Sequence, residues 1–340
     1  MSDHKEKKLE EISIAANIEQ SGISVSAKSR AFSALDRLIG SLFDLPSSFL
    51  ESVTLKKRLR DEVNERLISA QMIVAEQKIH DMPELGLTLI NDVLKDKARK
   101  QANVAGVAVE AINAMKALPP PQKTTEEAST EDSKAKIEDD WMNQFSRYAE
   151  DASSDHLQQI WGRVLAGEIQ EPGSFSRHTL RFIAELDKKT AENCEIIRRY
   201  VVGNWFFHNK KWHTDELFLV SVDLRRLGII EGGNVGGPEH ISEIRPDGST
   251  GIFGETYGLI VQGDPGTKLT FPVFLLTRLG QQVMSLLKIG DEAASLREVV
   301  NSLNKTNLKI ISLGLIEEKK KDAIIFKVPL EVLWKSDQKE

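Results

Sequence analysis

Three consecutive prolines, Pro119–Pro121, place the strongest constraint on how this chain can fold. Proline removes a backbone hydrogen bond and its ring clashes with the preceding turn, so an α-helix ends before such a run. The proline-free stretch Leu87–Leu118 precedes them, and Q-K-T-T-E-E-A-S-T-E-D-S-K-A-K, with no apolar side chain larger than alanine, follows them. The sequence therefore predicts a long-helix region over residues 31–118 and a disordered linker over residues 119–136.

Two charge-rich segments make up most of the long-helix region. Val53–His80 and Leu87–Leu118 carry apolar residues at helical spacing, and Pro83 and Gly86 interrupt the chain between them. Two long helices joined by a short turn predict an antiparallel helical hairpin.

An amphipathic helix is predicted before the hairpin. Apolar residues from Phe32 to Phe43 recur at three- and four-residue steps, and Pro46 interrupts the pattern. Ordinary burial in the core is favoured over a membrane surface, because the polar face offers few cations for anionic lipid. Residues 1–30 are polar and rich in serine, and we expect a flexible tail there.

Small residues gather in the second half of the Leu87–Leu118 segment. They are Ala102, Ala105, Gly106, Ala108 and Ala111. Such a stripe lets another helix approach closely, and that helix could belong to the same chain or to a second copy. Both interpretations stay open, since helices of this length need burial from somewhere.

Composition restricts the classes of protein that remain. Lys and Arg total 45 against 51 Asp and Glu, a formal net charge of −6, which disfavours a uniformly basic nucleic-acid binder. Cys194 is the only cysteine, so no internal disulfide forms and a reducing compartment is expected. The first residues lack the apolar core of a signal peptide, and no apolar run reaches the length of a bilayer span. We therefore expect a cytoplasmic protein with no membrane span.

The densest local pattern lies in a predicted helical domain at residues 137–202. A helix capped by Ser153 or Ser154 carries an apolar stripe that includes Trp161, and Trp141 belongs to a stripe on the preceding helix. Three short helices folded around aromatic side chains are expected. The residues of this signature, mostly with structural roles, are Trp141, Trp161, Leu165, Gly167, Glu168, Pro172, Gly173, Ser174, Phe175 and Ser176.

Glu168 is the member of this set with acid–base chemistry. No histidine, lysine or second carboxylate stands at a spacing that would pair with it. We therefore expect Glu168 to act as a cap, or to form an ion pair with Arg163 or Arg177, rather than to catalyse a reaction.

The signature resembles a known family. The run W-G-R-V-L-A-G-E-I-Q-E-P-G-S-F-S-R-H-T-L, from Trp161 to Leu180, is similar to a bacterial family called a domain of unknown function, whose core is W-x-x-L-L-A-G-E-I-x-x-P-G-S-F-S. Val164 stands where that family often has leucine. The resemblance covers roughly residues 135–290 and implies a helical front half, a polar linker and an α/β tail. The run W-G-R-V-L-A, from Trp161 to Ala166, also bears a looser resemblance to the W-x-x-L-L-A helix of abortive-infection alpha proteins of phage defence.

Residues 203–335 predict a winged-helix-like α/β domain. A helix over Asp215–Leu227, a glycine stop, β-strands and a further helix after Thr277 follow the order of such a module. The possible nucleic-acid contacts are Lys210, Lys211, Arg225 and Arg226. Asp215 and Glu216 would repel phosphate at the start of the reading helix, so protein contact is favoured over DNA.

The fold class predicted for the whole chain is α+β and predominantly helical. It has a long N-terminal helical hairpin, a central small helical bundle and a C-terminal winged-helix-like α/β part. His208 and His213 lack a third metal ligand, and no catalytic motif occurs, so no catalytic residue, metal or cofactor is expected.

Three functional hypotheses follow from this organisation, and the least favoured is an enzyme of unrecognised type that assembles Asp139, Asp140 and Glu168. The first is a non-enzymatic cytoplasmic sensor or scaffold that self-associates through its long helices, presents the α/β part to a protein partner, and serves anti-phage defence by abortive infection. The alternative is a DNA-binding transcriptional regulator that uses the winged-helix-like part.

Overall fold

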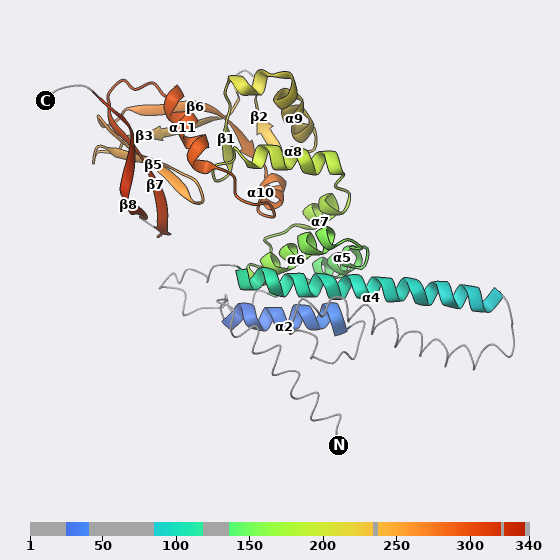
Figure 1. Ribbon diagram of the computed structural model, residues 1–340. Coiled ribbons are helices and arrows are strands. Elements are labelled where there is room, and N and C mark those ends of the chain that lie inside the picture. The colour runs from blue at the N-terminus through green and yellow to red at the C-terminus, as the bar shows by residue number, and fades with distance from the viewer. Residues whose placement is uncertain (1–24, 41–84, 118–135, 234–236, 321–322, 337–340) are drawn as a thin grey trace. The chain divides into compact units, whose positions relative to one another are not determined.

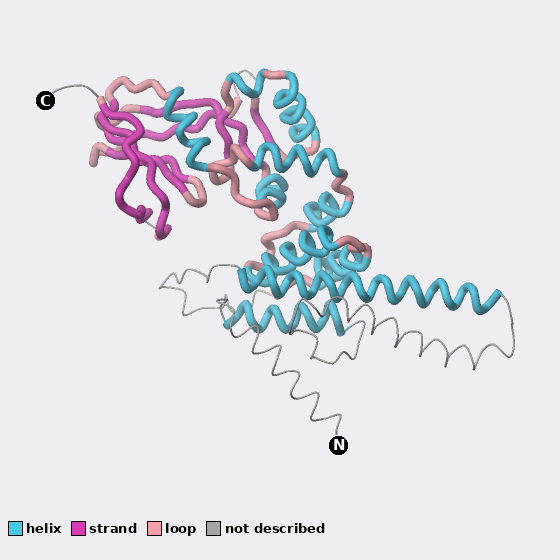
Figure 2. Tube along the Cα trace, viewed as in Figure 1, coloured by secondary structure: helices cyan, strands magenta, loops and turns pink. Residues whose placement is uncertain are grey.

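The computed structural model describes residues 25–40, 85–117, 136–233, 237–320 and 323–336 (Figure 1). The chain divides into two compact units, Met1–Ala184 and Glu185–Glu340. Among the described residues, the first unit contains only helices and loops, and both β-sheets lie in the second (Figure 2). The fold class is therefore mixed α+β, as predicted, with antiparallel sheets in the C-terminal part.

The described part of the first unit is a set of α-helices that differ widely in length. They are α2 (Val25–Gly40), α4 (Leu85–Ala117), α5 (Asp139–Glu150), α6 (Asp155–Gln170) and α7 (Arg177–Ala184). α4 has 33 residues and runs alongside α2 and α6 (Figure 1). α6 packs against both of these helices and carries the first half of the signature.

α2 is longer at its start than the sequence predicted. Residues 25–30, expected in the flexible tail, are helical, because Ala27 continues the buried face of Ala31, Ala34 and Leu38. Phe32, placed on that face from the sequence, is instead exposed. The continuation of this amphipathic helix beyond Gly40, the Val53–His80 arm of the hairpin and most of the predicted linker lie outside the described residues.

α4 and α6 approach so closely that their contact requires glycine. A Cβ atom added to Gly162 would lie 2.5 Å from the Cβ atom of Glu110 and 2.8 Å from the backbone nitrogen of Ala111. A Cβ atom on Gly106 would overlap the side-chain amide of Gln158. Because carbon atoms in contact stand about 3.5–4.0 Å apart, a larger residue at Gly162 would separate the two helices.

The small residues of α4 serve this contact within the chain. Ala105, Gly106, Ala108 and Ala111 are buried, Ala102 is half-buried, and α6 packs against α4. The structure thus bears out packing within the same chain for this stripe. The other interpretation, a self-association seam that includes the half-buried Ala102, stays a prediction, because the structure contains one chain.

Arg30 joins α2 to the end of α6. Its Nε atom donates to the carbonyl oxygen of Ile169 at 2.7 Å, and its Nη2 atom donates to that of Gln170 at 2.8 Å. The last carbonyls of a helix have no partner within the helix and carry partial negative charge. A guanidinium group at this position therefore satisfies them and fixes the direction in which the chain leaves α6.

The second unit alternates helices with short and long strands. Its elements are α8 (Lys188–Arg198), β1 (Trp205–Phe207), the 3₁₀ helix η3 (Lys210–His213), α9 (Asp215–Arg226), β2 (Ile230–Gly232), β3 (Glu239–Glu243), β4 (Ser249–Phe253), β5 (Tyr257–Gly263), β6 (Lys268–Leu276), α10 (Arg278–Met284), α11 (Glu292–Ser302), β7 (Leu308–Lys319) and β8 (Ile324–Lys335). α8 packs with α9 and α10, so it belongs to this unit, although the sequence grouped it with the signature helices.

Two antiparallel sheets organise the second unit. In the first, β6 pairs with β1, β2 and β3, and in the second the strand order is β4-β5-β7-β8. Near the C-terminus the sequence predicts a hairpin of strands Ile310–Ile316 and Ala323–Val328. β7 and β8 form this hairpin, and both strands are longer than expected. α11 packs its buried Leu296 and Val299 into the same apolar cluster as Leu259 and Ile311 of the second sheet.

We predict that Gly162→Ala lowers the free energy of unfolding by about 1–3 kcal/mol, because the added methyl group forces α6 away from the backbone of α4. This cost outweighs the gain in helix propensity of about 1 kcal/mol that alanine brings. Urea unfolding followed by circular dichroism measures the change. Gln159→Ala, at an exposed position of the same helix, is the control and should stay within about 0.5 kcal/mol of the original protein. Equal midpoints for the two variants would contradict the close approach.

Candidate functional site: the loop between α6 and α7

α6 begins and packs as its sequence dictates. Ser154 accepts a hydrogen bond from the backbone nitrogen of Leu157 at 3.2 Å, and so caps the helix. Trp161, Leu165 and Ile169 are buried along one face, as the apolar stripe predicted. Glu168 lies beside this face and is also buried, with only 2% of its surface exposed.

The carboxylate of Glu168 holds the loop that follows α6. Its Oε1 atom accepts from the backbone nitrogen of Gly173 at 2.7 Å. Its Oε2 atom accepts from the backbone nitrogen of Phe175 at 3.0 Å and from the hydroxyl of Ser174 at 3.3 Å. A buried carboxylate needs such donors to replace its lost hydration. Glu168 thus acts as a loop cap, one of the two roles expected from the sequence.

The glycines of the signature are needed for the shape of this loop. Gly173 has φ +88°, in the left-handed region that side chains rarely adopt. A Cβ atom on Gly167 would lie 2.7 Å from the ring of Phe175, so the absence of a side chain there lets the ring pack against α6. Phe175 is itself buried and draws the loop onto the helix.

Two further hydrogen bonds fix the loop to its neighbours. The indole Nε1 atom of Trp141, on α5, donates to the carbonyl oxygen of Phe175 at 2.7 Å. The hydroxyl of Ser176 accepts from the backbone nitrogen of Thr179 at 3.1 Å and caps α7. The loop therefore links α5, α6 and α7 to one another.

Aromatic rings continue this assembly across α5 and α6. Trp141 stacks on Phe145 with ring centroids 5.1 Å apart, and Phe145 meets Trp161 edge to face at 5.7 Å. Tyr148 stacks on the other side of Trp161 at 5.4 Å. Ring pairs in these geometries each add about 0.5–1.5 kcal/mol beyond simple burial. The tryptophans of the signature are thus the centre of the small helical core.

The electrostatic environment of Glu168 follows from its burial. Removal from water raises the pKa of Glu168 above its ordinary value, because burial penalises the charged form. The hydrogen bonds from Gly173, Phe175 and Ser174 lower the pKa and oppose this effect. Arg177, one of the two cations considered as a partner, instead approaches Asp140 at 3.6 Å. Loop donors, rather than that cation, therefore compensate the carboxylate.

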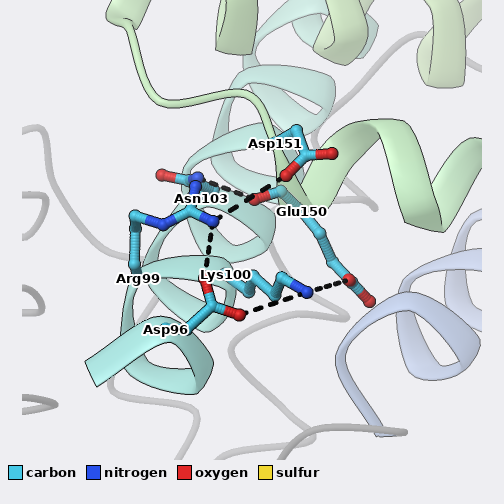
Figure 3. Close-up of polar contacts among 6 residues, drawn as sticks. All are labelled: Asp96, Arg99, Lys100, Asn103, Glu150 and Asp151. Atoms are coloured by element: carbon cyan, nitrogen blue, oxygen red, sulfur yellow. Dashed lines mark hydrogen bonds and ion pairs between the residues drawn. The ribbon is translucent and has the colours of Figure 1, made fainter. Parts of the chain in front are cut away.

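The C-terminal end of α5 is fixed to α4 by a second group of polar contacts (Figure 3). The side-chain amide of Asn103 donates to the carbonyl oxygen of Glu150 at 2.7 Å. Asp96 lies 2.7 Å from Arg99 and 3.3 Å from Lys100, and these hydrogen bonds lower the pKa of Asp96. Lys100 also lies 3.7 Å from Glu150. Because these charged groups are solvated, salt screens their ion pairs. The hydrogen bond from the side-chain amide of Asn103 to Glu150 is therefore the specific part of the contact.

A polar pocket of about 580 Å³ lies beside the signature loop. It is lined by Asp140, Asn143, Gln144, Arg147, Tyr148 and Arg177, which come from α5 and the start of α7. Arg147 makes no hydrogen bond or ion pair with the residues that the structure describes. The pocket was missed from the sequence, because it forms only where the signature loop brings Arg177 back to α5. Its lining offers hydrogen bonds and charge but no nucleophile with an adjacent base.

Two of the four basic residues considered for nucleic acid have partners within the chain. Lys211 pairs with Glu298 of α11. Arg225 donates to the carbonyl oxygens of Ser221 at 3.3 Å and Gly232 at 3.2 Å, so its guanidinium serves the end of its own helix. Lys210 on η3 and Arg226 on α9 are exposed. Only two of the four charges thus stand ready for an external phosphate.

The other chemically distinctive residues have structural surroundings. His208 and His213 lie with ring centroids 5.2 Å apart, and burial, followed by the charges of His213 and Arg225, lowers the pKa of His208. Within the described ranges no group of three or more His, Cys, Asp or Glu side chains is placed to hold a metal ion. Burial raises the pKa of Cys194 to about 12, so it is a thiol at neutral pH.

A second loop-holding carboxylate was missed from the sequence. Glu292, at the start of α11, is buried and accepts from the backbone nitrogens of Glu255 at 2.8 Å, Thr256 at 2.6 Å and Tyr257 at 3.1 Å. It holds the turn between β4 and β5 as Glu168 holds the signature loop. No local pattern signals this role, because the donors stand more than thirty residues away in the chain.

The fold and the site together define a mixed α+β protein whose signature motif closes a structural loop. Residues 89–204 match the model of a family described as Protein of unknown function (DUF2806). The resemblance to a family of unknown function is thereby confirmed, but the match begins within α4 and ends after α8, not at residue 290. No curated protein and no solved structure matches the chain. Among the described helices, none combines the length and the apolar character needed to cross a bilayer.

We predict that Glu168→Ala lowers the free energy of unfolding by about 2–4 kcal/mol, because donors of the loop lose their acceptor while partly or fully buried. Glu171→Ala removes an exposed carboxylate from the same loop and should change stability by at most about 0.5 kcal/mol. Chemical unfolding measures both variants. Equal losses in the two would contradict the role given to Glu168.

The pH dependence of Glu168→Gln gives a separate test. Because the folded pKa of Glu168 is raised, folding favours the protonated carboxyl. This contribution is fully present below the ordinary pKa and is lost as the pH rises through the raised pKa. The stability of the original protein relative to Glu168→Gln should therefore fall as the pH rises from about 4 towards neutrality. A difference that grows with pH would show that the loop donors outweigh burial.

Proposed function

We propose that the protein is a non-enzymatic sensor or scaffold that works by protein contact through its α/β unit. The observation that carries this proposal is the outer face of α9. Leu219 is 59% exposed on that face, its chain neighbour Phe218 is 47% exposed, and Leu227, just after the end of α9, is 42% exposed on another side. Large exposed apolar side chains are typical of protein interfaces, where aromatic and aliphatic residues replace charge.

The helical unit supports the same proposal. Its signature residues hold a loop and three helices in one arrangement, as expected of a scaffold. The cytoplasm and anti-phage defence by abortive infection remain our proposals for its setting, the latter from the similarity of the W-x-x-L-L-A helix. Cys194, a buried thiol, suits a reducing compartment.

A DNA-binding regulator is the second candidate, and the topology of the first sheet favours it. The order α8, β1, η3, α9, β2 and β6, with β6 between β1 and β2, is the order that a winged-helix-like module would have. In that case α9 would be the reading helix. Its exposed residues argue against this use, because Glu216 would repel phosphate and Arg225 is engaged with carbonyl groups.

Photo-crosslinking in cells tests the proposed protein contact. We predict that a photoreactive residue at Leu219 yields a protein adduct of higher mass. The same residue at Ile289, 48% exposed before α11, should yield none and is the control. Adducts at neither position, or equally at both, would remove the proposal.

Electrophoretic mobility of duplex DNA separates the two candidates. The scaffold proposal predicts no retardation even at low salt. A regulator would retard DNA at low salt and lose affinity steeply as salt rises, since each phosphate contact releases counterions. Retardation with that salt dependence would replace the scaffold by the regulator.

A further inference from the structure

We propose that the outer face of α9 binds the same face of a second copy of this chain, with the two helices antiparallel. This inference rests on the proposed function and names the partner of the protein-contact surface. It places self-association in the α/β unit, away from the small-residue stripe of α4, which α6 covers.

The first argument is the division of α9 into two sides. Val220, Ser221 and Leu224 are buried against the rest of the unit. On the opposite side, Leu219 and Arg226 are exposed, and Val222 lies half-buried between them. Residues three, four and seven positions apart share one helix face, so these three form a continuous stripe.

The charges that accompany the stripe are its second argument. Glu216, Asp223 and Arg226 form no ion pair with any residue of the described ranges. Glu216 and Asp223 flank the stripe on one side, and Arg226 stands on it near the C-terminal end. The surface thus carries both signs of charge around an apolar centre, and a partner must bring both signs in the opposite order.

A second copy meets that requirement through symmetry. A twofold contact places the same patch on both copies, so the patch must be complementary to itself. Glu216 and Arg226 stand five residues before and after Ser221. When two α9 helices pack antiparallel about the level of Ser221, Arg226 of each copy lies level with Glu216 of the other. A parallel arrangement would place like charges together and is excluded.

The size of the surface sets the strength of the contact. α9 has 12 residues, and two such helices bury less than the roughly 1,600 Å² of a standard stable complex. The association should therefore depend strongly on protein concentration. Leu219 and Val222 would supply most of the affinity, and the charges would fix the relative direction of the two helices.

Sedimentation equilibrium of the full chain across a wide concentration range tests the inference. We expect a monomer–dimer equilibrium that Leu219→Asp weakens at least about tenfold, which corresponds to about 1.4 kcal/mol. Ile241→Asp on β3 is the matched control, since Ile241 is 63% exposed and lies away from α9 in the fold. This control should leave the equilibrium unchanged, and thermal unfolding checks that both variants fold.

A charge reversal tests the antiparallel direction. Arg226→Glu and Glu216→Arg should each weaken the dimer, because each brings like charges together. The double variant Glu216→Arg/Arg226→Glu restores opposite charges at both positions and should recover the original equilibrium. Failure of the double variant to recover would overturn the arrangement.

A monomer at all concentrations, or a dimer insensitive to Leu219→Asp, would overturn this inference. If Leu219 then crosslinks a different protein in cells, the proposed function stands without it. DNA retardation that Arg226→Glu abolishes would assign α9 to nucleic acid and overturn both.

Discussion

The hydrogen bonds that the Glu168 carboxylate accepts are the interaction on which the helical unit depends. They close the loop between α6 and α7, and the closed loop presents the carbonyl oxygen of Phe175 to the indole of Trp141. Through that bond α5 is set against α6, and the aromatic rings of both helices meet. The signature has a glutamate at this position because the loop presents several donors at once. The two oxygens of a carboxylate offer enough acceptor positions for all of them.

Close backbone approach is the second condition of this unit. Gly162 allows α6 to lie against Glu110 and Ala111, and this approach buries the small residues of α4. The same physical device appears in the second unit, where Gly254 makes room for the carboxylate of Glu292 above the β4–β5 turn. Both units thus combine a buried carboxylate that organises a loop with glycines that let elements approach closely. A larger residue in place of either glycine would push these elements apart.

Function is therefore best sought on the surface of the protein. Two features of that surface are candidates for binding. They are the exposed apolar stripe of α9 and the polar pocket in which Arg147 has no partner among the described residues. The first lies in the α/β unit and the second beside the signature loop.

The sequence by itself determined the elements whose signals are local. Periodicity and caps predicted α4, α6 and α9, alternation predicted the β7–β8 hairpin, and the spacing of W-G-R-V-L-A-G-E-I-Q-E-P-G-S-F-S predicted a structural motif. The partner of the α4 stripe, the donors of Glu168, the role of Glu292 and the pocket beside Arg177 were decided only by tertiary structure. The reason is physical: a helix or turn is encoded by residues within four positions of each other, whereas a buried carboxylate or a glycine contact acquires its meaning from whatever segment the fold brings against it.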